Sequence, residues 1–333
     1  MPFPALLELE DLSVSFSLGE KSVEVVSGVS FSVESGKTLA LVGESGCGKS
    51  VTASSVMRLL PQPHGRVTSG TIRFQGTDVL SLPLDEMHRL RGGKMAMIFQ
   101  EPMTALNPVH PAGAQIKEVL ELHRDDIPAK GRAEAVLGLL DDVDMPSPAE
   151  RARAYPFQLS GGMRQRVMIA MALAGMPELL IADEPTTALD VTVQAQIMSL
   201  LAELQQQTGM GLILITHDLG VVAEVADQVV VMYAGREVEK GPSLPVYHRP
   251  AHPYTMGLMD SLPRRDVHTE RLRPIKGSPP DLLAIPSGCP FRPRCRHAAD
   301  ICAAQEPPLA AVAAGRVSAC HFWEEVSRER SGA

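Results

Sequence analysis

The sequence of 333 residues lacks the apolar run of about 18 residues that a membrane-spanning helix requires. Its first residues, Met1 to Pro4, place no positively charged segment ahead of an apolar core, so we expect no secretory signal peptide. Basic residues do not predominate, because 31 Lys and Arg stand against 39 Asp and Glu. This balance argues against nucleic acid as the main partner. We therefore expect a soluble protein, or one that reaches a membrane only through its partners.

Cysteine is also scarce, and its distribution is uneven. Of five cysteines, Cys47 stands alone, whereas Cys289, Cys295, Cys302 and Cys320 cluster towards the end of the sequence. Without an export signal, four clustered cysteines favour a metal or cluster site over a disulfide framework.

Apolar patterning predicts an α/β fold. Residues alternate between apolar and polar over much of the first forty positions, which is typical of half-buried strands. Continuous short apolar runs at 38–42, 95–99, 179–182 and 212–215 indicate fully buried strands. Helix-like stretches separate these runs, so we expect a parallel sheet with helices between its strands.

The length predicts about two domains. We place the first at residues 1–240 and include in it a helical subdomain at about 101–158, where apolar residues recur at helical spacing. The second comprises residues 241–333, where frequent prolines disfavour long helices and strands. We expect this Pro- and Cys-rich region to be a separate appendage on the core.

A glycine-rich loop follows the first continuous apolar run. Residues 43–50 read Gly-Glu-Ser-Gly-Cys-Gly-Lys-Ser, which matches the P-loop pattern between a strand and a helix. Its glycines let several backbone N–H groups face one anion, and the helix N-terminus adds partial positive charge. We expect Lys49 to neutralise the β- and γ-phosphates and Ser50 to bind Mg²⁺, and we interpret Cys47 as a small side chain without a redox role. The other phosphate-binding candidates are Gly43, Ser45, Gly46, Cys47, Gly48 and Val51.

Polar side chains stand at the ends of three further predicted strands. Asp183 and Glu184 follow one apolar run, where one carboxylate can hold Mg²⁺ and the next can deprotonate an attacking water. His217 and Gln100 end two other runs, and on their own they carry little information. With a P-loop upstream, the Asp-Glu pair is a strong indication of phosphoryl transfer.

Residues 159–166 read Leu-Ser-Gly-Gly-Met-Arg-Gln-Arg, which resembles the signature motif of ATP-binding cassette ATPases. The other motifs stand in that family's order, and the resemblance covers about residues 6–240. It implies a P-loop NTPase core, the ATP-binding cassette, that binds ATP and Mg²⁺.

The resemblance also implies roles for single residues. Glu184 would be the general base, and His217 would contact the γ-phosphate. Gln100 and Asp183 would join the P-loop serine as ligands of Mg²⁺. Phe16 would stack on adenine, and an inward-facing core phenylalanine is the alternative interpretation of this residue.

In the resembling family the site is split between two subunits. The signature opens a helix whose N-terminus is a second anion binder, and it meets the γ-phosphate on the partner's P-loop. Asp190 would lie at the seam between the subunits. A second ATPase subunit is therefore an expected partner, and in the subgroup described next it is commonly a different chain. The signature residues expected to take part are Ser160, Gly161, Gly162 and Gln165.

Three segments resemble one subgroup, the ATPase subunits of bacterial oligopeptide and dipeptide importers. They are the extended Q-loop at 99–108, the segment that begins at residues 252–255, and the cysteine-bearing segment 289–295. The resemblance implies a peripheral subunit at the cytoplasmic face of the cell membrane, bound to two transmembrane permease subunits. An extracytoplasmic peptide-binding protein would deliver the substrate. Importers of nickel and other solutes share parts of these segments, so another cargo is the alternative.

The four clustered cysteines have the spacing C-x5-C-x6-C-x17-C, without the tight C-x2-4-C pairs that zinc ribbons favour. Such loose spacing suits a [4Fe–4S] cluster, and the subgroup resemblance points the same way. Zinc is the rival, because His297 or His321 could complete a Cys3His set. Free or disulfide-linked thiols are a third interpretation. The expected role is structural, closing a loop that has few apolar residues.

A soluble cassette ATPase acting on nucleic acid or ribosomes is the rival from another class. Chromosome and repair ATPases place a very long coiled coil between P-loop and signature, whereas only a compact insert separates Lys49 from Ser160. Ribosome-acting members carry two cassettes in a chain, and this sequence has one. We therefore expect a transporter ATPase without a nucleic-acid partner.

Overall fold

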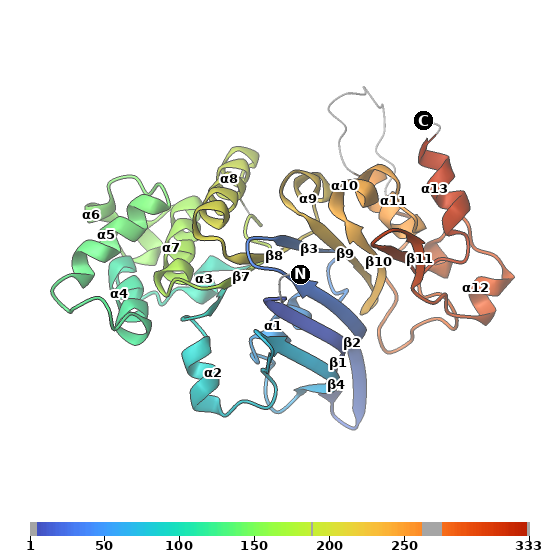
Figure 1. The fold of residues 1–333 in the computed structure, drawn as a ribbon, viewed down its shortest axis with the longest axis horizontal. Coiled ribbons are helices and arrows are strands. Elements are labelled where there is room, and N and C mark those ends of the chain that lie inside the picture. The colour runs from blue at the N-terminus through green and yellow to red at the C-terminus, as the bar shows by residue number, and fades with distance from the viewer. Residues whose placement is uncertain (1–4, 188, 262–274, 332–333) are drawn as a thin grey trace. The chain divides into compact units, whose positions relative to one another are not determined.

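The computed structural model describes residues 5–187, 189–261 and 275–331 (Figure 1). The chain divides into two compact units. The first comprises Met1–Val33, Thr38–Leu80 and Ile215–Ala333, and the second comprises Glu34–Lys37 and Ser81–Leu214.

An antiparallel sheet in the first unit has the strand order β2-β1-β4-β5. Burial alternates at the start of β1, where Leu7 and Leu9 are buried, because side chains of a strand point to opposite faces in turn, whereas residues 12–15 are all buried. Register shifts between Leu9 and Ser15 interrupt its pairing with β2. The strands are β1 (Leu7–Leu18), β2 (Lys21–Val33), β4 (Gly65–Phe74) and β5 (Thr77–Asp78).

Five further strands of the first unit lie side by side in the order β11-β12-β10-β9-β3. Strand β3 runs parallel to β9, pairing Val42 with Val231, and every residue of β3 is buried. Strand β12 pairs antiparallel with β10, so the C-terminal region extends this row of strands. The strands are β3 (Thr38–Val42), β9 (Gln228–Tyr233), β10 (Arg236–Pro242), β11 (Ala310–Ala313) and β12 (Arg316–Ser318).

The helices of the first unit are short. Proline and glycine break the segment after β10, so helix there comes in pieces of at most nine residues. Helix α11 begins after His252, whose Nδ1 accepts a hydrogen bond from the N–H of Tyr254 at 3.1 Å. The helices are α1 (Lys49–Val56), α9 (Leu219–Val225), α10 (Ser243–His248), α11 (Pro253–Asp260), the 3₁₀ turn η2 (Arg292–Arg294), α12 (Asp300–Ala304) and α13 (Trp323–Ser331).

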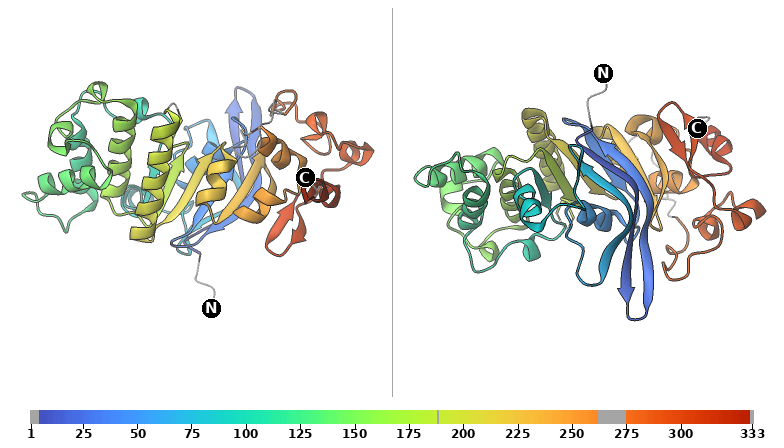
Figure 2. Two further views of the ribbon diagram at one scale, coloured as in Figure 1. Left: turned by 90° about the horizontal axis from the view of Figure 1, so that it is seen from above. Right: turned by 60° about the horizontal axis from the view of Figure 1, so that its bottom comes forward.

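The second unit combines parallel strands with a group of helices. Strands β6 and β7 are parallel, with Met95 opposite Leu179, and β8 lies next to β7. Helices α4, α5 and α7 pack on one another, and Figure 2 shows these green segments gathered into one bundle. The strands are β6 (Met95–Ile98), β7 (Leu179–Asp183) and β8 (Gly211–Thr216), whose last two residues belong to the first unit. The helices are α2 (Leu84–Leu90), α3 (Pro102–Ala105), α4 (Ala112–His123), α5 (Arg132–Asp142), α6 (Pro148–Arg151), the 3₁₀ turn η1 (Pro156–Gln158), α7 (Gly161–Ala174) and α8 (Val191–Thr208).

The alternation of strands and helices predicted from the sequence is confirmed, and β3, β6, β7 and β8 occupy the four continuous apolar runs. The expected separateness of the C-terminal region is wrong. Its strand β12 pairs with β10, and its aromatic residues enter the core that surrounds Tyr233. Within the described ranges, every helix is too short or too polar to cross a bilayer.

A buried ion pair joins β10 to β12. The carboxylate of Glu239 is completely buried and accepts hydrogen bonds from Arg316 at 2.9 Å and from the N–H groups of Ala251 and His252. Burial raises the pKa of Glu239, and the hydrogen bonds from Ala251 and Arg316 oppose this. Removing the cation from such a pair leaves a buried charge without compensation.

We expect Arg316→Met to lower the free energy of unfolding by about 3–5 kcal/mol in urea titrations of the full chain. Lys117→Ala is the control, because Lys117 forms an exposed ion pair with Glu121, and pairs of that kind contribute about 0.5 kcal/mol or less. Equal effects of the two substitutions would contradict the importance of the buried pair.

Candidate functional site

The glycine-rich loop links β3 to α1 in the first unit. Gly43, Gly46 and Gly48 have φ angles of 152°, 80° and 106°, which side-chain-bearing residues rarely adopt. A Cβ on Gly43 would lie 2.3 Å from the carbonyl oxygen of Met232 and 2.7 Å from Sγ of Cys47. The loop therefore takes its shape by packing its glycine backbone directly against the end of β9.

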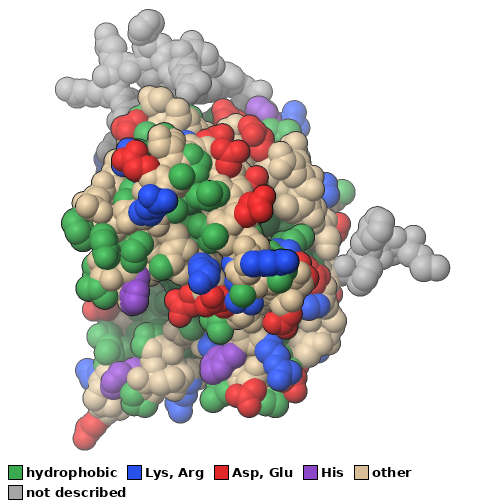
Figure 3. Space-filling view, turned by 90° about the vertical axis from the view of Figure 1, so that its left-hand side faces the viewer, with side chains coloured by type: hydrophobic (Ala, Val, Ile, Leu, Met, Phe, Trp, Pro, Cys, Tyr) green, Lys and Arg blue, Asp and Glu red, His purple; other side chains and the backbone are tan. Residues whose placement is uncertain are grey.

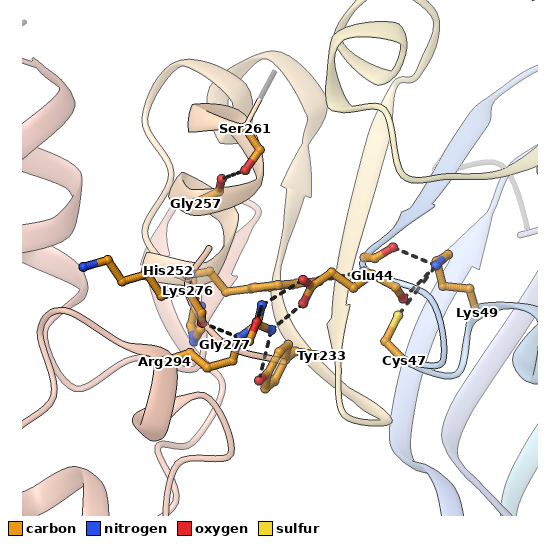
Figure 4. Close-up of polar contacts among 12 residues, drawn as sticks. Glu44, Cys47, Lys49, Tyr233, His252, Gly257, Ser261, Lys276, Gly277 and Arg294 are labelled. Carbon is orange, nitrogen blue, oxygen red and sulfur yellow. Dashed lines mark hydrogen bonds and ion pairs between the residues drawn. The ribbon is translucent and has the colours of Figure 1, made fainter. Parts of the chain in front are cut away.

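Lys49 is buried at the start of α1 and is held by the loop itself. Its Nζ donates to the carbonyl oxygens of Gly43 at 2.7 Å and Glu44 at 3.1 Å, and lies 3.8 Å from Sγ of Cys47 (Figure 4). Burial raises the pKa of Cys47, so this side chain is a neutral thiol around neutral pH. This agrees with a packing role for Cys47 rather than a nucleophilic one.

The other predicted residues of the loop differ in exposure. Ser45 and Gly46 are exposed at its tip, while Gly48 is buried as the N-cap of α1. Ser50 and Val51 are half-buried in the first turn of the helix. An exposed tip followed by a helix N-terminus is the arrangement that anion-binding loops share.

Two residues of the C-terminal region contact the loop. The guanidinium of Arg294 donates to both carboxylate oxygens of Glu44, at 2.5 Å and 2.9 Å. The hydroxyl of Tyr254 accepts a hydrogen bond from the N–H of Glu44 at 2.7 Å. The hydrogen bonds with Glu44 raise the pKa of Arg294, and burial raises that of Tyr254. Arg294 is therefore a cation and Tyr254 a neutral phenol over the whole physiological range.

In the second unit, two candidate catalytic side chains are in direct contact. Nε2 of Gln100 donates to Oε2 of Glu184 at 3.0 Å, and Oγ1 of Thr187 donates to the same oxygen at 2.9 Å. Glu184 has a φ of 45°, a strained conformation for a residue with a side chain, and it directly follows the buried Asp183 at the end of β7. The amide and the hydroxyl orient the carboxylate, which can accept a proton from water.

The signature segment forms a capped helix start in the second unit. Oγ of Ser160 accepts a hydrogen bond from the N–H of Met163 and so caps α7. A Cβ on Gly161 would lie 3.5 Å from the side chain of Leu189, and a Cβ on Gly162 would lie 3.0 Å from that of Val193.

Asp190 caps the next helix, α8, by accepting a hydrogen bond from the N–H of Val193 at 3.0 Å. Ser160 and Asp190 are both exposed, whereas Gln165 is buried and its Nε2 has no hydrogen-bond partner among the described residues. Gln165 thus lies inside the unit rather than at the exposed helix start.

His217 and Phe16 both belong to the first unit. His217 is exposed directly after β8, and the next residue, Asp218, caps α9 by accepting a hydrogen bond from the N–H of Gly220 at 2.8 Å. Phe16 is half-buried on β1, and its ring packs beside Gly65. Each side chain thus retains surface that a ligand could reach.

The four clustered cysteines line one small pocket, together with His252 and Phe291. All five cysteines of the chain are free thiols. Burial raises the pKa of Cys289, that of Cys295 to about 11 and that of Cys320 to about 12. Yet within residues 5–187, 189–261 and 275–331, no three His, Cys, Asp or Glu side chains form a group that could hold a metal ion. The side-chain positions therefore do not support the predicted iron–sulfur or zinc site.

Three residues escaped the sequence analysis: Thr187, Tyr254 and Arg294. Thr187 stands three residues after Glu184, close enough to be considered as a partner of the carboxylate. Tyr254 and Arg294 belong to segments singled out for other reasons. Nothing in the sequence pairs them with a loop residue more than two hundred positions away.

Comparisons with known proteins identify both parts of the chain. Residues 26–187 match the ABC transporter family, and residues 238–302 match the oligopeptide/dipeptide transporter C-terminal region. The chain is 51% identical over 316 residues to the oligopeptide transport ATP-binding protein OppD of Escherichia coli (strain K12), covering 95% of this chain and 93% of that protein. It is 51% identical over 297 residues to the dipeptide transport ATP-binding protein DppD of Bacillus subtilis (strain 168), covering 89% and 88%.

A solved structure supports the fold. A dimeric ATP-binding cassette in a post-hydrolysis state, bound to ADP and Pi, is similar with a TM-score of 0.64 and 26% sequence identity. The similarity covers 71% of this chain and 98% of that one.

We expect Gly43→Ala to abolish nucleoside triphosphate binding, because the new methyl group would collide with the Met232 carbonyl and force the loop out of shape. Equilibrium binding of a fluorescent ATP analogue measures this. Gly138→Ala is the control, since Gly138 lies in α5 with nothing within 4 Å of its added Cβ. Tight binding by Gly43→Ala would show that the loop does not depend on this contact.

Proposed function

Because the chain belongs to the ATP-binding cassette family of transporter ATPases, we propose that it powers the import of oligopeptides or dipeptides by hydrolysing ATP. The family and the cassette fold are those that the resemblance of the motifs implied. The observation that carries the proposal is the presence in one chain of a cassette and of the oligopeptide/dipeptide transporter C-terminal region. Relatives that match 95% and 89% of this chain are named as oligopeptide and dipeptide transport ATP-binding proteins. We propose a functional division at about residue 240, with the helical subdomain at about 101–158.

In this proposal the phosphate loop binds the triphosphate. Lys49 exchanges its bonds to the loop carbonyls for the β- and γ-phosphates, and the helix N-terminus adds partial positive charge. Ser50, Asp183 and Gln100 would hold Mg²⁺, which when bound would neutralise charge on the phosphates. The donor types fit this ion, because hydroxyl and carboxylate oxygens are the ligands that Mg²⁺ prefers. Phe16 supplies an aromatic ring for adenine.

Glu184 acts as the general base in the same proposal. Gln100 and Thr187 hold one of its oxygens, which orients the carboxylate for accepting a proton from the attacking water. His217 contacts the γ-phosphate. Gln100 is also a proposed ligand of Mg²⁺. Its hydrogen bond to Glu184 would therefore change when Mg²⁺ and the nucleotide bind.

We propose that a second ATPase subunit, a different chain, completes each site. The capped start of α7 presents backbone N–H groups beside Gly161 and Gly162, which suits an anion on the partner's phosphate loop. Asp190 lies at the seam. The buried Gln165 acts by supporting the signature helix from within.

The exposed apolar side chains of the second unit support a contact with membrane permease subunits. Val109 is 72% exposed and Phe157 66% exposed, and the ring of Phe157 stacks on that of Tyr155 at 5.7 Å. Figure 3 looks onto the helical end of this unit, where hydrophobic side chains interleave with charged ones. We place the protein at the cytoplasmic face of the cell membrane with two permease subunits, and an extracytoplasmic binding protein delivers the peptide.

We further propose that the four clustered cysteines hold a [4Fe–4S] cluster with a structural role. The donor set fits in kind and number, because four thiols line one pocket. The thiols would have to move closer together to bind a cluster, since the described side chains form no group that could hold a metal ion. The N–H groups of His297 and Phe322 lie 3.3 Å and 3.4 Å from the sulfur atoms of Cys295 and Cys320, as donors that stabilise thiolates.

Zinc is less well supported, because both candidate histidines have other partners. Nε2 of His297 lies 3.3 Å from a Glu329 oxygen, and Nε2 of His321 lies 3.2 Å from the carbonyl oxygen of Gln305. Binding a metal here requires the thiols to lose their protons, although burial raises their pKa values.

We expect Glu184→Gln to bind ATP as the wild type does but to lower turnover by about 10²–10⁴-fold, because an amide cannot accept the proton of water. Phosphate release and nucleotide binding are measured on the same preparation. Glu178→Gln is the matched control, since Glu178 precedes β7 and pairs with Lys94 on the surface. Hydrolysis that survives Glu184→Gln undiminished would count against the assignment.

Protein purified without oxygen should contain about four iron atoms per chain and absorb visible light. Cys289→Ser should remove the iron and the colour, whereas Cys47→Ser should keep both, because Cys47 lies in the phosphate loop. A colourless protein with one zinc ion per chain would replace the iron–sulfur proposal by the zinc alternative.

A further inference from the structure

The phosphate loop carries an acidic residue in an unfavourable place. Glu44 directly follows Gly43, and its side chain is 27% exposed. A carboxylate at this position repels the negatively charged phosphates that the loop is built to bind, and a partly buried charge is poorly screened by solvent. Binding a polyanion here therefore requires that the charge of Glu44 be compensated.

The compensating charge comes from the C-terminal region. Arg294 lies 250 positions away in the sequence, yet the two terminal nitrogens of its guanidinium donate one hydrogen bond each to the two carboxylate oxygens of Glu44 (Figure 4). Such bidentate pairs are among the strongest charge-assisted hydrogen bonds in proteins. The side chain of Arg294 is only 5% exposed, so solvent does little to weaken the pair.

The position of Arg294 is itself strongly determined. Its Nε donates to the carbonyl oxygen of Lys276, and its two terminal nitrogens donate to Glu44, Gly277 and the Tyr233 hydroxyl. All five N–H groups of the guanidinium thus have an acceptor nearby.

Aromatic rings provide the second support. The guanidinium carbon of Arg294 lies 5.8 Å from the centroid of Tyr233 and 5.9 Å from that of Phe291. Tyr254 packs against both of these rings, with centroids 4.7 Å and 5.4 Å away, and its hydroxyl accepts a hydrogen bond from the N–H of Glu44. The side chain of Arg294 is thus held in position without a bound nucleotide.

We propose that Arg294 is a positioning residue for nucleotide binding, which cancels the charge of Glu44 and so makes the phosphate loop receptive to a triphosphate. The proposal rests on the proposed function, since it takes a nucleotide as the ligand of the loop. The C-terminal region thereby contributes to the affinity of the cassette for ATP.

The test is equilibrium ATP binding to the full chain at low salt, with Arg294→Ala, Glu44→Gln and the double variant. Arg294→Ala should weaken binding by about tenfold, because Glu44 then repels the phosphates. Glu44→Gln should tighten it about threefold or more, because Arg294 is then an unpaired cation beside the loop. The double variant should return to within about threefold of the wild type. Salt should shrink both single effects.

Arg296→Ala is the matched control. Arg296 stands two residues further along the same segment and pairs with Glu329 instead of the loop, so we expect wild-type ATP binding. Arg294→Lys keeps the charge but loses the pair of hydrogen bonds to Glu44. Its affinity for ATP should therefore lie between those of the wild type and Arg294→Ala.

A double variant that binds as weakly as Arg294→Ala would overturn the proposal, because Arg294 would then be a mechanical tether only. Unchanged binding by Arg294→Ala would overturn it as well. If Arg294→Ala misfolds, Glu44→Gln still tests the proposal. ATP binding by Glu44→Gln that is weaker than that of the wild type would contradict charge compensation. A wild-type chain that binds no ATP would refute the proposed function and this inference with it.

Discussion

The close approach of Gly43 to the carbonyl oxygen of Met232 is the constraint on which the first unit depends. It exists because β3 and β9 are parallel neighbours in fixed register, so the chain that leaves β3 must turn at the end of β9. Only glycine allows that contact. The same end of β9 continues into Tyr233, whose ring packs against Tyr254 and Phe291. One short stretch of backbone thus supports the phosphate loop and also receives the C-terminal region.

This shared support places the C-terminal region against the glycine-rich loop, where Arg294 pairs with Glu44. Phe291 lines the cysteine pocket and also packs against Tyr233, and Arg294 follows it by one turn of 3₁₀ helix to reach Glu44. Closing the cysteine-bearing loop therefore fixes the position of the arginine as well.

The second unit holds the carboxylate of Glu184, the proposed general base, in a fixed orientation. Glu184 has a strained backbone conformation, and the amide of Gln100 and the hydroxyl of Thr187 fix its side chain. Strain of about 1–3 kcal/mol persists only where surrounding structure imposes it, and here the completely buried strand β7 does so. The packing of β7 thus holds Glu184 in place at the end of the strand.

The sequence by itself determined the features that depend on residues close together in the chain. The loop at 43–50, the buried strands and the signature are contiguous patterns, so they could be identified in the sequence, and their resemblance to a known family implied the fold. Only the tertiary structure decided which distant side chains meet. Glu44 and Arg294 are 250 positions apart, Gln100 and Glu184 are 84 apart, and β12 pairs with β10 although its region was expected to be separate. Such contacts depend on strand pairing and core packing, which no local pattern encodes.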